Sequence, residues 1–116
     1  MSRAAAVAAY GQAWREPDAE ARRRLLEQAW AEGGVYCDPQ VLLTGRAALV
    51  EHIGGFQASA PGWEIAVTSE PLEHHDAAYF TWTLCDADGA VAVTGIDVAL
   101  FGADGRIERL TGFFTG

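Results

Sequence analysis

The sequence predicts an α+β fold in which three helices pack on one side of a strongly curved antiparallel sheet. Three features of the sequence support this prediction. Apolar residues recur at helical spacing in residues 3–15, 19–31 and 46–58. Stretches rich in β-branched and aromatic residues fill the second half, where Asp-Gly pairs at 88–89 and 104–105 mark tight reversals. Helices followed by such strands are typical of an α+β domain, and a bent sheet covered by helices encloses a conical pocket suited to small molecules.

The first predicted helix covers residues 3–15 and is amphipathic, with Tyr10 and Trp14 on its apolar face. Pro17 ends this helix, because the residue before a proline is disfavoured in helical conformation. Asp18 follows immediately and is a favourable cap for a second helix. Two short helices joined by a tight connection are therefore expected to open the chain.

The second and third helices are bounded by glycine and proline. Residues 19–31 carry an apolar stripe, and the glycine pair at 33–34 is predicted to end this helix. The three arginines at 22–24 lie among acidic residues and are expected to face solvent. Residues 46–58 form the third helix, with Phe56 on its apolar face, and a Pro-Gly pair then breaks it.

Five segments are predicted to be strands, because they are apolar and rich in β-branched or aromatic residues. They cover residues 35–38, 63–69, 77–86, 91–101 and 106–114. The remaining segments, including the residues between 69 and 77, are expected to be loops.

The composition describes a single domain, residues 1–116, and excludes several classes of function. No apolar stretch is long enough to cross a membrane, and no signal-peptide pattern opens the chain, so we expect a cytoplasmic protein. The net charge is −8, and the basic side chains are all arginine. Without lysine, neither Schiff-base chemistry nor a phosphate-binding Walker loop is available. An acidic chain also binds nucleic acid poorly.

No sequence motif for a cofactor is present, and a single cluster carries metal-binding side chains. This cluster is Glu73-His74-His75-Asp76. On a strand, adjacent histidines point to opposite faces and cannot easily share an ion, although in a loop they could. We therefore expect neither a metal nor a cofactor.

Asp97 is the most informative residue, because it lies in the most hydrophobic predicted strand. Alternation puts its side chain on the same face as Gly95 and Phe101. An ionised carboxylate among apolar neighbours is costly unless it is paired, whereas a raised pKa would keep it neutral and able to donate a hydrogen bond. Two other interpretations stay open: Asp97 faces water on an edge strand, or pairs with Arg106 or Arg109 of the next strand.

Asp38 is the second carboxylate of interest. It ends the predicted strand 35–38, and Tyr36 lies on the same side of that strand. An aspartate before a proline is often a turn residue or a helix cap, and this interpretation stays open beside a functional one.

Taken together, these features resemble the nuclear-transport-factor-2-like superfamily, and within it the branch of ketosteroid isomerases and SnoaL-like polyketide cyclases. The resemblance covers nearly the whole chain and implies a cystatin-like α+β roll with an internal pocket. Its residues are Tyr10 and Asp18, Val35-Tyr36-Cys37-Asp38-Pro39, Gly45 with the helix after it, Gly95-Ile96-Asp97, Ala103-Asp104-Gly105-Arg106-Ile107 and Gly112-Phe113-Phe114.

The resemblance implies an enzyme that needs no cofactor and acts on an apolar, carbonyl-bearing small molecule. By the isomerase pattern, Asp38 is a general base that moves a proton between carbons, while Tyr10 and a protonated Asp97 donate hydrogen bonds to the enolate oxygen. The chain departs from that pattern at Trp30 and Ile53, which stand where those isomerases carry tyrosines.

Further residues are expected to line the pocket. His52 lies at the edge of the apolar face of its helix and is an alternative base if it points inward rather than to solvent. The other expected ligand contacts are aromatic, with ordinary core packing as their alternative role. They are Trp14, Tyr36, Phe56, Tyr79, Trp82 and Phe114.

Two further hypotheses stand beside proton transfer next to a carbonyl. A hydrolase or dehydratase of the same fold would use Asp97 with His52, His75 or Tyr36 as proton carriers. A non-catalytic binding or dimerisation module would instead pair Asp97 with an arginine, Arg106 or Arg109.

Relatives in the resembled superfamily commonly dimerise through the outer face of the sheet, and we expect a homodimer here. The segment 77–86 is apolar on both faces, which is compatible with such an interface. Strand parity leaves open which of two sets faces inward: Tyr79, Thr81, Thr83 and Cys85, or Phe80, Trp82 and Leu84.

Overall fold

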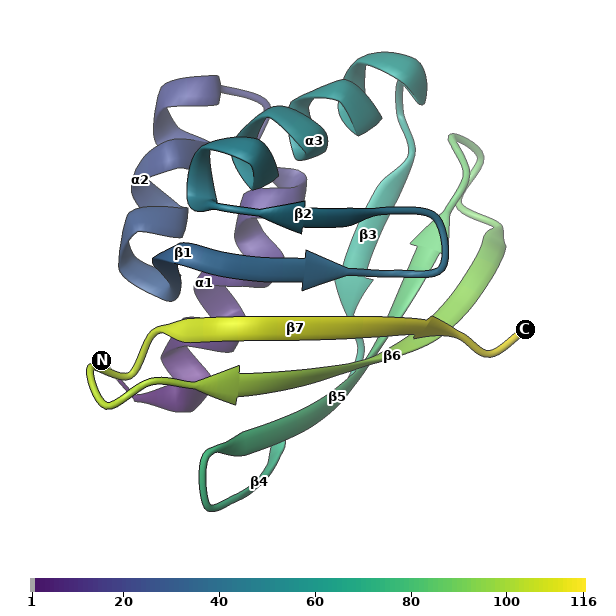
Figure 1. Ribbon diagram of the computed structural model, residues 1–116. Helices are drawn as coiled ribbons and strands as arrows, with labels where there is room; N and C mark the ends of the chain where they lie inside the picture. Colours follow the sequence, from purple (N-terminus) through teal and green to yellow (C-terminus); the bar gives the residue numbers. More distant parts are fainter. Residues whose placement is uncertain (1) are drawn as a thin grey trace.

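The computed structural model describes residues 2–116, which form three helices and one seven-stranded sheet. The helices lie together on one side of the sheet, and the sheet curls around them without closing into a barrel (Figure 1). This arrangement confirms the predicted α+β class. The concave face of the sheet is the one that the helices cover.

All three predicted helices are present: α1 (Arg3–Arg15), α2 (Ala19–Ala29) and α3 (Arg46–Ser59). α1 and α2 begin after Ser2 and Asp18, whose side chains each accept a hydrogen bond from a main-chain amide of the first turn, at 3.0 and 2.8 Å. These caps satisfy amide groups that have no partner within the helix, which is why both helices start where the sequence predicts.

The strands occupy the order β2-β1-β7-β6-β5-β3 across the sheet, and β4 also pairs with β5. Every pairing is antiparallel except that of β1 with β7, which is parallel. The sheet is therefore mixed rather than wholly antiparallel, because residues 38–106 separate β1 from β7 and so long a connection allows a parallel return. The strands are β1 (Trp30–Cys37), β2 (Leu42–Thr44), β3 (Glu64–Val67), β4 (Leu72–His74), β5 (Ala77–Cys85), β6 (Val91–Phe101) and β7 (Ile107–Phe114).

β1 begins earlier than predicted and contains the glycine pair that was expected to end α2. α2 ends at Ala29, and β1 continues directly from Trp30. The pairing of β1 with β7 is irregular between Trp30 and Val35. A side chain at Gly34 would collide with the fully buried Trp30 indole, so glycine makes room for a ring here instead of ending a helix.

β2 and β4 lie in segments that the sequence predicts as loops. Each has three residues, too few for an alternating pattern to be detected. β4 is the antiparallel partner of the start of β5, and the turn between them holds His75 in a left-handed conformation with a φ of 50°. The histidine pair therefore lies partly on a strand and partly in a turn.

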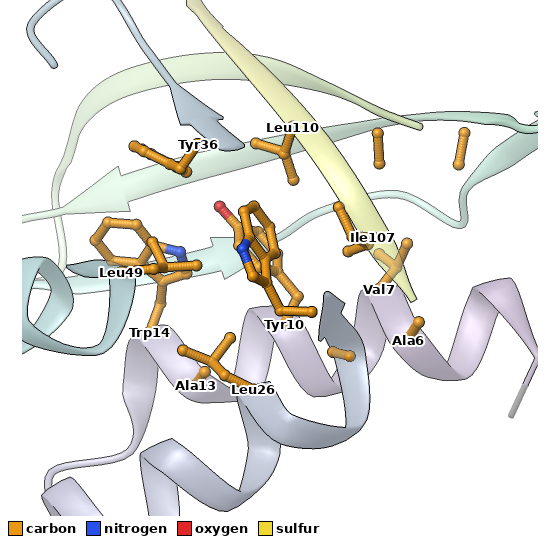
Figure 2. Packing of buried hydrophobic residues seen from close by; sticks show 14 of the residues in the cluster. Ala6, Val7, Tyr10, Ala13, Trp14, Leu26, Tyr36, Leu49, Ile107 and Leu110 are labelled. Atoms are coloured by element: carbon orange, nitrogen blue, oxygen red, sulfur yellow. The ribbon is translucent and has the colours of Figure 1, made fainter. Parts of the chain in front are cut away.

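The core forms where α1 faces the concave side of the sheet. Figure 2 shows Tyr10 and Trp14 projecting from α1 toward Tyr36 of β1 and Leu110 of β7. Trp30 stacks on Tyr10 with ring centroids 5.6 Å apart. Burial of such large aromatic side chains contributes strongly to the hydrophobic stabilisation of a domain of this size.

Arg22 lies inside the protein and not at the solvated face expected from its neighbours. It is 4% exposed, and its guanidinium donates to the main-chain oxygens of Glu16 and Pro17 and, at 2.9 Å, to the side-chain oxygen of Gln57. It therefore joins the α1–α2 connection to α3. Arg23 instead pairs with acidic residues of its own helix at the surface, as expected.

β5 shows which of its two apolar sets faces inward. Phe80 and Trp82 are 0% and 9% exposed, whereas Tyr79 is 39% exposed. Tyr79 therefore lies on the outer face and does not line the pocket, contrary to expectation. The physical reason is alternation: once Phe80 packs inside, its neighbour in the strand must point outward.

Candidate active site

A cavity of about 780 Å³ lies between α1, α3 and the concave face of the sheet. Its volume is typical of small-molecule sites. The residues predicted from the sequence to act in catalysis or ligand binding all line this cavity, apart from Tyr79 and His75. They are Tyr10, Trp14, Tyr36, Asp38, His52, Phe56, Trp82, Asp97 and Phe114.

Two glycines shape the floor of the cavity. A side chain at Gly95 of β6 would collide with the Trp82 indole, which lies across it from β5. A side chain at Gly112 of β7 would begin 2.9 Å from Asp97 Oδ1 and 3.7 Å from Asp38 Cβ. Because Gly112 has no side chain, Asp97 and Asp38 can both approach the same point of the floor.

Asp97 is buried in this floor, with 7% of its surface exposed. Within residues 2–116 its carboxyl accepts no hydrogen bond and forms no ion pair. Arg106 donates instead to the main-chain oxygen of Glu27 at 2.8 Å and pairs with Asp104 at 3.2 Å. Arg109 is exposed on β7. The arginine-paired interpretation of Asp97 and the edge-strand interpretation are therefore both wrong.

Burial raises the pKa of Asp97 to about 7, from an ordinary value of 3.8. The Trp82 indole partly opposes this rise in pKa, and the nearby Asp38 carboxylate adds to it. The Trp82 N–H is buried but lies outside hydrogen-bond geometry with every acceptor in the described chain, so burial dominates. A carboxyl with this pKa is substantially protonated near neutral pH and can donate a hydrogen bond to a ligand.

Asp38 is half-buried after the end of β1 and accepts three hydrogen bonds. The Tyr36 hydroxyl donates to Oδ2 at 2.7 Å, and the main-chain amides of Gln40 and Val41 donate to Oδ1 at 2.8 and 3.0 Å. The amide contacts form a side-chain turn, so the turn interpretation is confirmed. The same carboxylate lines the cavity, so the turn also presents it to a ligand.

Tyr10 projects from α1 to the cavity and is 3% exposed. Its ring lies between Trp30 and Phe80, whose ring centroids are 5.6 and 6.4 Å away. Its hydroxyl forms no hydrogen bond of good geometry within residues 2–116. Burial raises the pKa of Tyr10, and the negative charge of Asp97 raises it further. The Trp14 indole only partly opposes this rise in pKa, so the hydroxyl stays protonated and is available as a donor.

The two departures from the isomerase pattern lie in the core. Trp30 and Ile53 are fully buried. The Trp30 indole N–H meets no acceptor in the part of the chain that the structure describes. Tyr10 is therefore supported by ring packing and not by a network of hydrogen-bonded tyrosines.

Trp14 is the centre of an aromatic wall. The rings of Tyr36, His52 and Phe56 lie around it, with centroids 5.9, 5.9 and 5.7 Å from that of Trp14. His52 also lies 5.7 Å from Tyr36. The side chain of His52 therefore points toward the cavity, which is the inward of its two interpretations.

Sequence reasoning missed the polar residues Gln40, Glu51 and Ser59, which also line the cavity. The signal for two of them was helical spacing, because the cavity-lining residues of α3 recur along one face of the helix. These residues are Ala48, Glu51, His52, Gly55, Phe56 and Ser59. Glu51 is exposed and lies at the rim.

The histidine pair at the β4–β5 turn lies away from the cavity. The Nδ1 atoms of His74 and His75 are 3.2 Å apart. No group of three metal-binding side chains occurs among residues 2–116, so this pair has no third partner there. His75 does not line the cavity and therefore cannot serve as a proton carrier in it.

Solved structures with known family membership resemble this fold. The chain is 32% identical, with a TM-score of 0.91 and 100% of each chain covered, to an isomerase candidate of the SnoaL-like family from Agrobacterium tumefaciens. A nuclear-transport-factor-2-like protein of unknown function from Exiguobacterium is 20% identical, with a TM-score of 0.75 over 95% of this chain and 98% of that one. A polyketide cyclase candidate from Sinorhizobium meliloti is 19% identical, with a TM-score of 0.73 over 92% of each chain.

Comparisons with protein-family models and with curated proteins found no match. Between residues 2 and 116, no helix is both long and apolar enough to span a membrane.

Proposed function

The chain belongs to the SnoaL-like family, and from this premise we propose that it is an enzyme that moves a proton next to the carbonyl group of an apolar small molecule. The reaction is an isomerisation or an aldol-type cyclisation. Both kinds of activity are represented, as candidates, among the similar structures. The fold alone does not specify the reaction, so the proposal rests on the groups in the cavity.

One observation carries the proposal: two buried hydrogen-bond donors without protein partners face the same cavity as a carboxylate. Tyr10 and Asp97 are 3% and 7% exposed, both line the cavity, and neither forms a hydrogen bond within the described residues. Their polar atoms therefore keep their hydrogen-bonding capacity for a ligand in the cavity, where the low dielectric strengthens such a bond. A carbonyl oxygen, which accepts two hydrogen bonds, has the matching chemistry.

In the proposed step, the Asp38 carboxylate takes a proton from the carbon next to the carbonyl. The electron pair of that C–H bond forms a new C=C bond, and the carbonyl π electrons move to oxygen, which becomes an enolate. Tyr10 and protonated Asp97 donate hydrogen bonds to this oxygen as its charge develops. In an isomerisation, a C=C bond of the substrate is conjugated with the enolate, Asp38 returns the proton to the far carbon of that system, and the carbonyl re-forms. In a cyclisation, the enolate carbon attacks a second carbonyl of the same molecule, and the resulting alkoxide takes the proton from Asp38.

Substitution of the base tests this proposal directly. Asp38→Asn keeps the shape of the side chain but removes its basicity, and we expect the exchange of α-protons for deuterium in a ketone ligand to slow by about 10²–10⁴-fold. Nuclear magnetic resonance of the ketone in D₂O measures this exchange.

Asp86 supplies a matched control. Its Oδ1 accepts hydrogen bonds from the amides of Asp88 and Ala90 at 2.9 and 3.0 Å, in the same kind of turn, but it does not line the cavity. Asp86→Asn therefore reports the structural cost of changing such a turn. Equal exchange rates in wild type and Asp38→Asn would remove Asp38 from the mechanism.

A second candidate function is water addition or elimination, with Asp97 and His52 or Tyr36 as proton carriers. The observation that favours it is the position of His52, 5.7 Å from the Tyr36 ring at the cavity wall. A limb of the pH–rate profile near the ordinary histidine pKa of about 6.5, lost in His52→Ala, would support this function over the first.

A non-catalytic module is disfavoured by the cavity floor. That hypothesis expects a filled interior and an arginine paired with Asp97. Asp97 instead has no such partner among the described residues and lines a cavity of about 780 Å³.

We also propose that two copies of the chain pack through the outer face of β5, β6 and β7. Tyr79, Leu100 and Phe113 are exposed on this face by 39%, 39% and 49%. Among its paired outward positions, Arg109 is the sole charged residue, although the chain carries 16 acidic residues. Two such faces can therefore meet with little charge repulsion, and a contiguous exposed apolar area favours association.

Sedimentation velocity tests the dimer. Val98→Glu places a charge in the middle of the outer face, and we expect it to convert a dimer into monomers. Ala90→Glu, in the β5–β6 turn, is the control and should leave the dimer intact. A wild-type protein that sediments as a monomer at micromolar concentration would contradict the proposal.

A further inference from the structure

The cavity is lined by acidic groups without a basic counterpart. Asp38, Glu51 and Asp97 all contribute to its surface. No arginine lines it within the described chain, and the protein has no lysine. His52 is therefore the only lining side chain that can become positively charged.

The arginines are all committed elsewhere in the fold. Arg22 is buried in the junction of the three helices, and Arg46 donates to the main-chain oxygen of Trp30 at 2.8 and 3.0 Å. Arg106 is bonded to Glu27 and Asp104. None of the remaining arginines lines the cavity: Arg3, Arg15, Arg23, Arg24 and Arg109. Among the described residues, no arginine therefore reaches the cavity lining.

From this distribution of charge we propose that the cavity selects its ligand by charge, binding a compound with a basic amine more tightly than its neutral analogue and rejecting the anionic analogue. The inference rests on the proposed function for the location of the site and adds a substrate class to it. The ligand is an apolar carbonyl compound that carries an ammonium group and no carboxylate or phosphate.

The cavity has different binding groups for the two ends of such a ligand. The carbonyl oxygen lies at the buried end, where Tyr10 and Asp97 have free hydrogen-bonding capacity. The ammonium group lies at the rim, near the exposed Glu51, while the aromatic ring of Phe56 lines the cavity from the same helix. Carboxylates and aromatic rings are the groups that attract an organic cation, and the low dielectric of a cavity strengthens both attractions.

Three matched ligands test the proposal by quenching of tryptophan fluorescence. They are acetylnaphthalene, the same ketone with a dimethylaminomethyl group on its distal ring, and the same ketone with a carboxylate there. Near pH 6.5, where Asp97 with a pKa of about 7 is largely protonated and can still hold the ketone oxygen, we expect the ammonium compound to bind about 5–10-fold more tightly than the ketone. The carboxylate should bind at least about tenfold more weakly than the ketone. A carboxylate that binds as well as the ketone, or an ammonium compound that binds no better, would overturn the proposal.

Two variants locate the effect. Glu51→Gln should lower the ratio of ammonium affinity to ketone affinity about threefold. Glu70→Gln removes an exposed charge outside the cavity and should not change this ratio. An equal effect of the two variants would assign the preference to the net charge of the protein and overturn the proposal.

If none of the three ligands binds, quenching of tryptophan fluorescence by small ions tests whether the cavity prefers cations to anions. Trp63 is exposed outside the cavity, whereas Trp14 and Trp82 line it and Trp30 is fully buried. In Trp63→Phe, each ion's quenching constant is divided by its constant for free N-acetyltryptophanamide, because the two ions differ in intrinsic quenching efficiency. The normalised constant should be several-fold larger for caesium than for iodide at an ionic strength of about 1 M, where surface charge is screened beyond about 3 Å. Equal normalised constants would overturn the proposal. Binding is measured separately from catalysis. A wild-type protein that shows the charge preference but catalyses no proton exchange would therefore refute the proposed function and leave this inference standing.

Discussion

The two faces of β6 differ in whether their polar side chains have hydrogen-bond partners within the protein. On the outer face, the Thr94 hydroxyl is hydrogen-bonded to that of Thr115 at 3.0 Å, and the next outward residue, Ile96, is apolar. On the inner face, Asp97 is buried beside Gly95 with no partner in the described residues. Alternate residues of one strand therefore have different roles. The outward polar side chain is hydrogen-bonded within the protein, whereas the inward carboxyl has no protein partner and is available to a ligand.

Side-chain volume accounts for much of this difference. The outward pairs between β6 and β7, such as Ile96 with Phe113, join large side chains across the strands. Two of the inward pairs between these strands contain a glycine: Gly95 opposite Phe114, and Asp97 opposite Gly112. The hollow thus arises because side chains are missing on one face, while the strands themselves stay paired.

The strongest test of the difference between the two faces of β6 is to truncate neighbouring residues that point to opposite faces. Asp97→Ala removes a proposed donor to the enolate, and we expect proton exchange to fall by about 10²–10³-fold. Val98→Ala, one residue later on the outer face, should change the rate by less than about threefold. Proton-exchange rates of both variants are measured on protein shown to be folded by circular dichroism. Similar losses of exchange rate in the two variants would show that catalysis does not depend on the inner face of β6.

A smaller effect is expected in the pH dependence of stability. The folded protein holds the Asp97 proton up to a pKa of about 7, whereas the unfolded chain releases it near 3.8, so stability falls as pH rises between these values. Asp97→Asn cannot ionise, and above about pH 8 we expect it to be more stable than wild type by on the order of 4 kcal/mol. Below about pH 4 the difference should vanish. Urea unfolding across this range measures it.

The control for this prediction is Asp88→Asn, in the exposed β5–β6 turn, which should not produce the same dependence on pH. A constant difference between Asp97→Asn and wild type from low to high pH would mean that burial does not raise the pKa of Asp97.

The smallest expected effect concerns the glycine between the two acids. In Gly112→Ala the new methyl group would begin 2.9 Å from Asp97 Oδ1, closer than real contacts allow, so the carboxyl must move. We expect proton exchange to slow by about tenfold, because a reaction slows when a catalytic group is displaced by a fraction of an ångström. Gly33→Ala meets no atom within 4 Å and should match wild type. An unaffected rate in Gly112→Ala would show that the position of Asp97 is not critical.

Much of the candidate site could be inferred before any coordinates, for local physical reasons. An acid in a strongly apolar strand has few stable environments, and alternation decides which neighbours share its face, so Asp97 was identifiable. Tyr10 and Trp14 followed from helical spacing in α1. Glu51 shows the limit: it lies beside His52 on the same helix, but its place at the cavity rim depends on how α3 sits over the sheet.

By itself the sequence determined the helices of this protein, its longer strands and the residues that share a face of each. Those properties follow from periodicity, capping and turn chemistry within a few residues. Only the tertiary structure decided that β1 runs parallel to β7, that Arg22 is buried, and that Tyr79 points outward. Strand partners, their directions and the sidedness of a face are set by contacts between segments far apart in the chain, which no local pattern encodes.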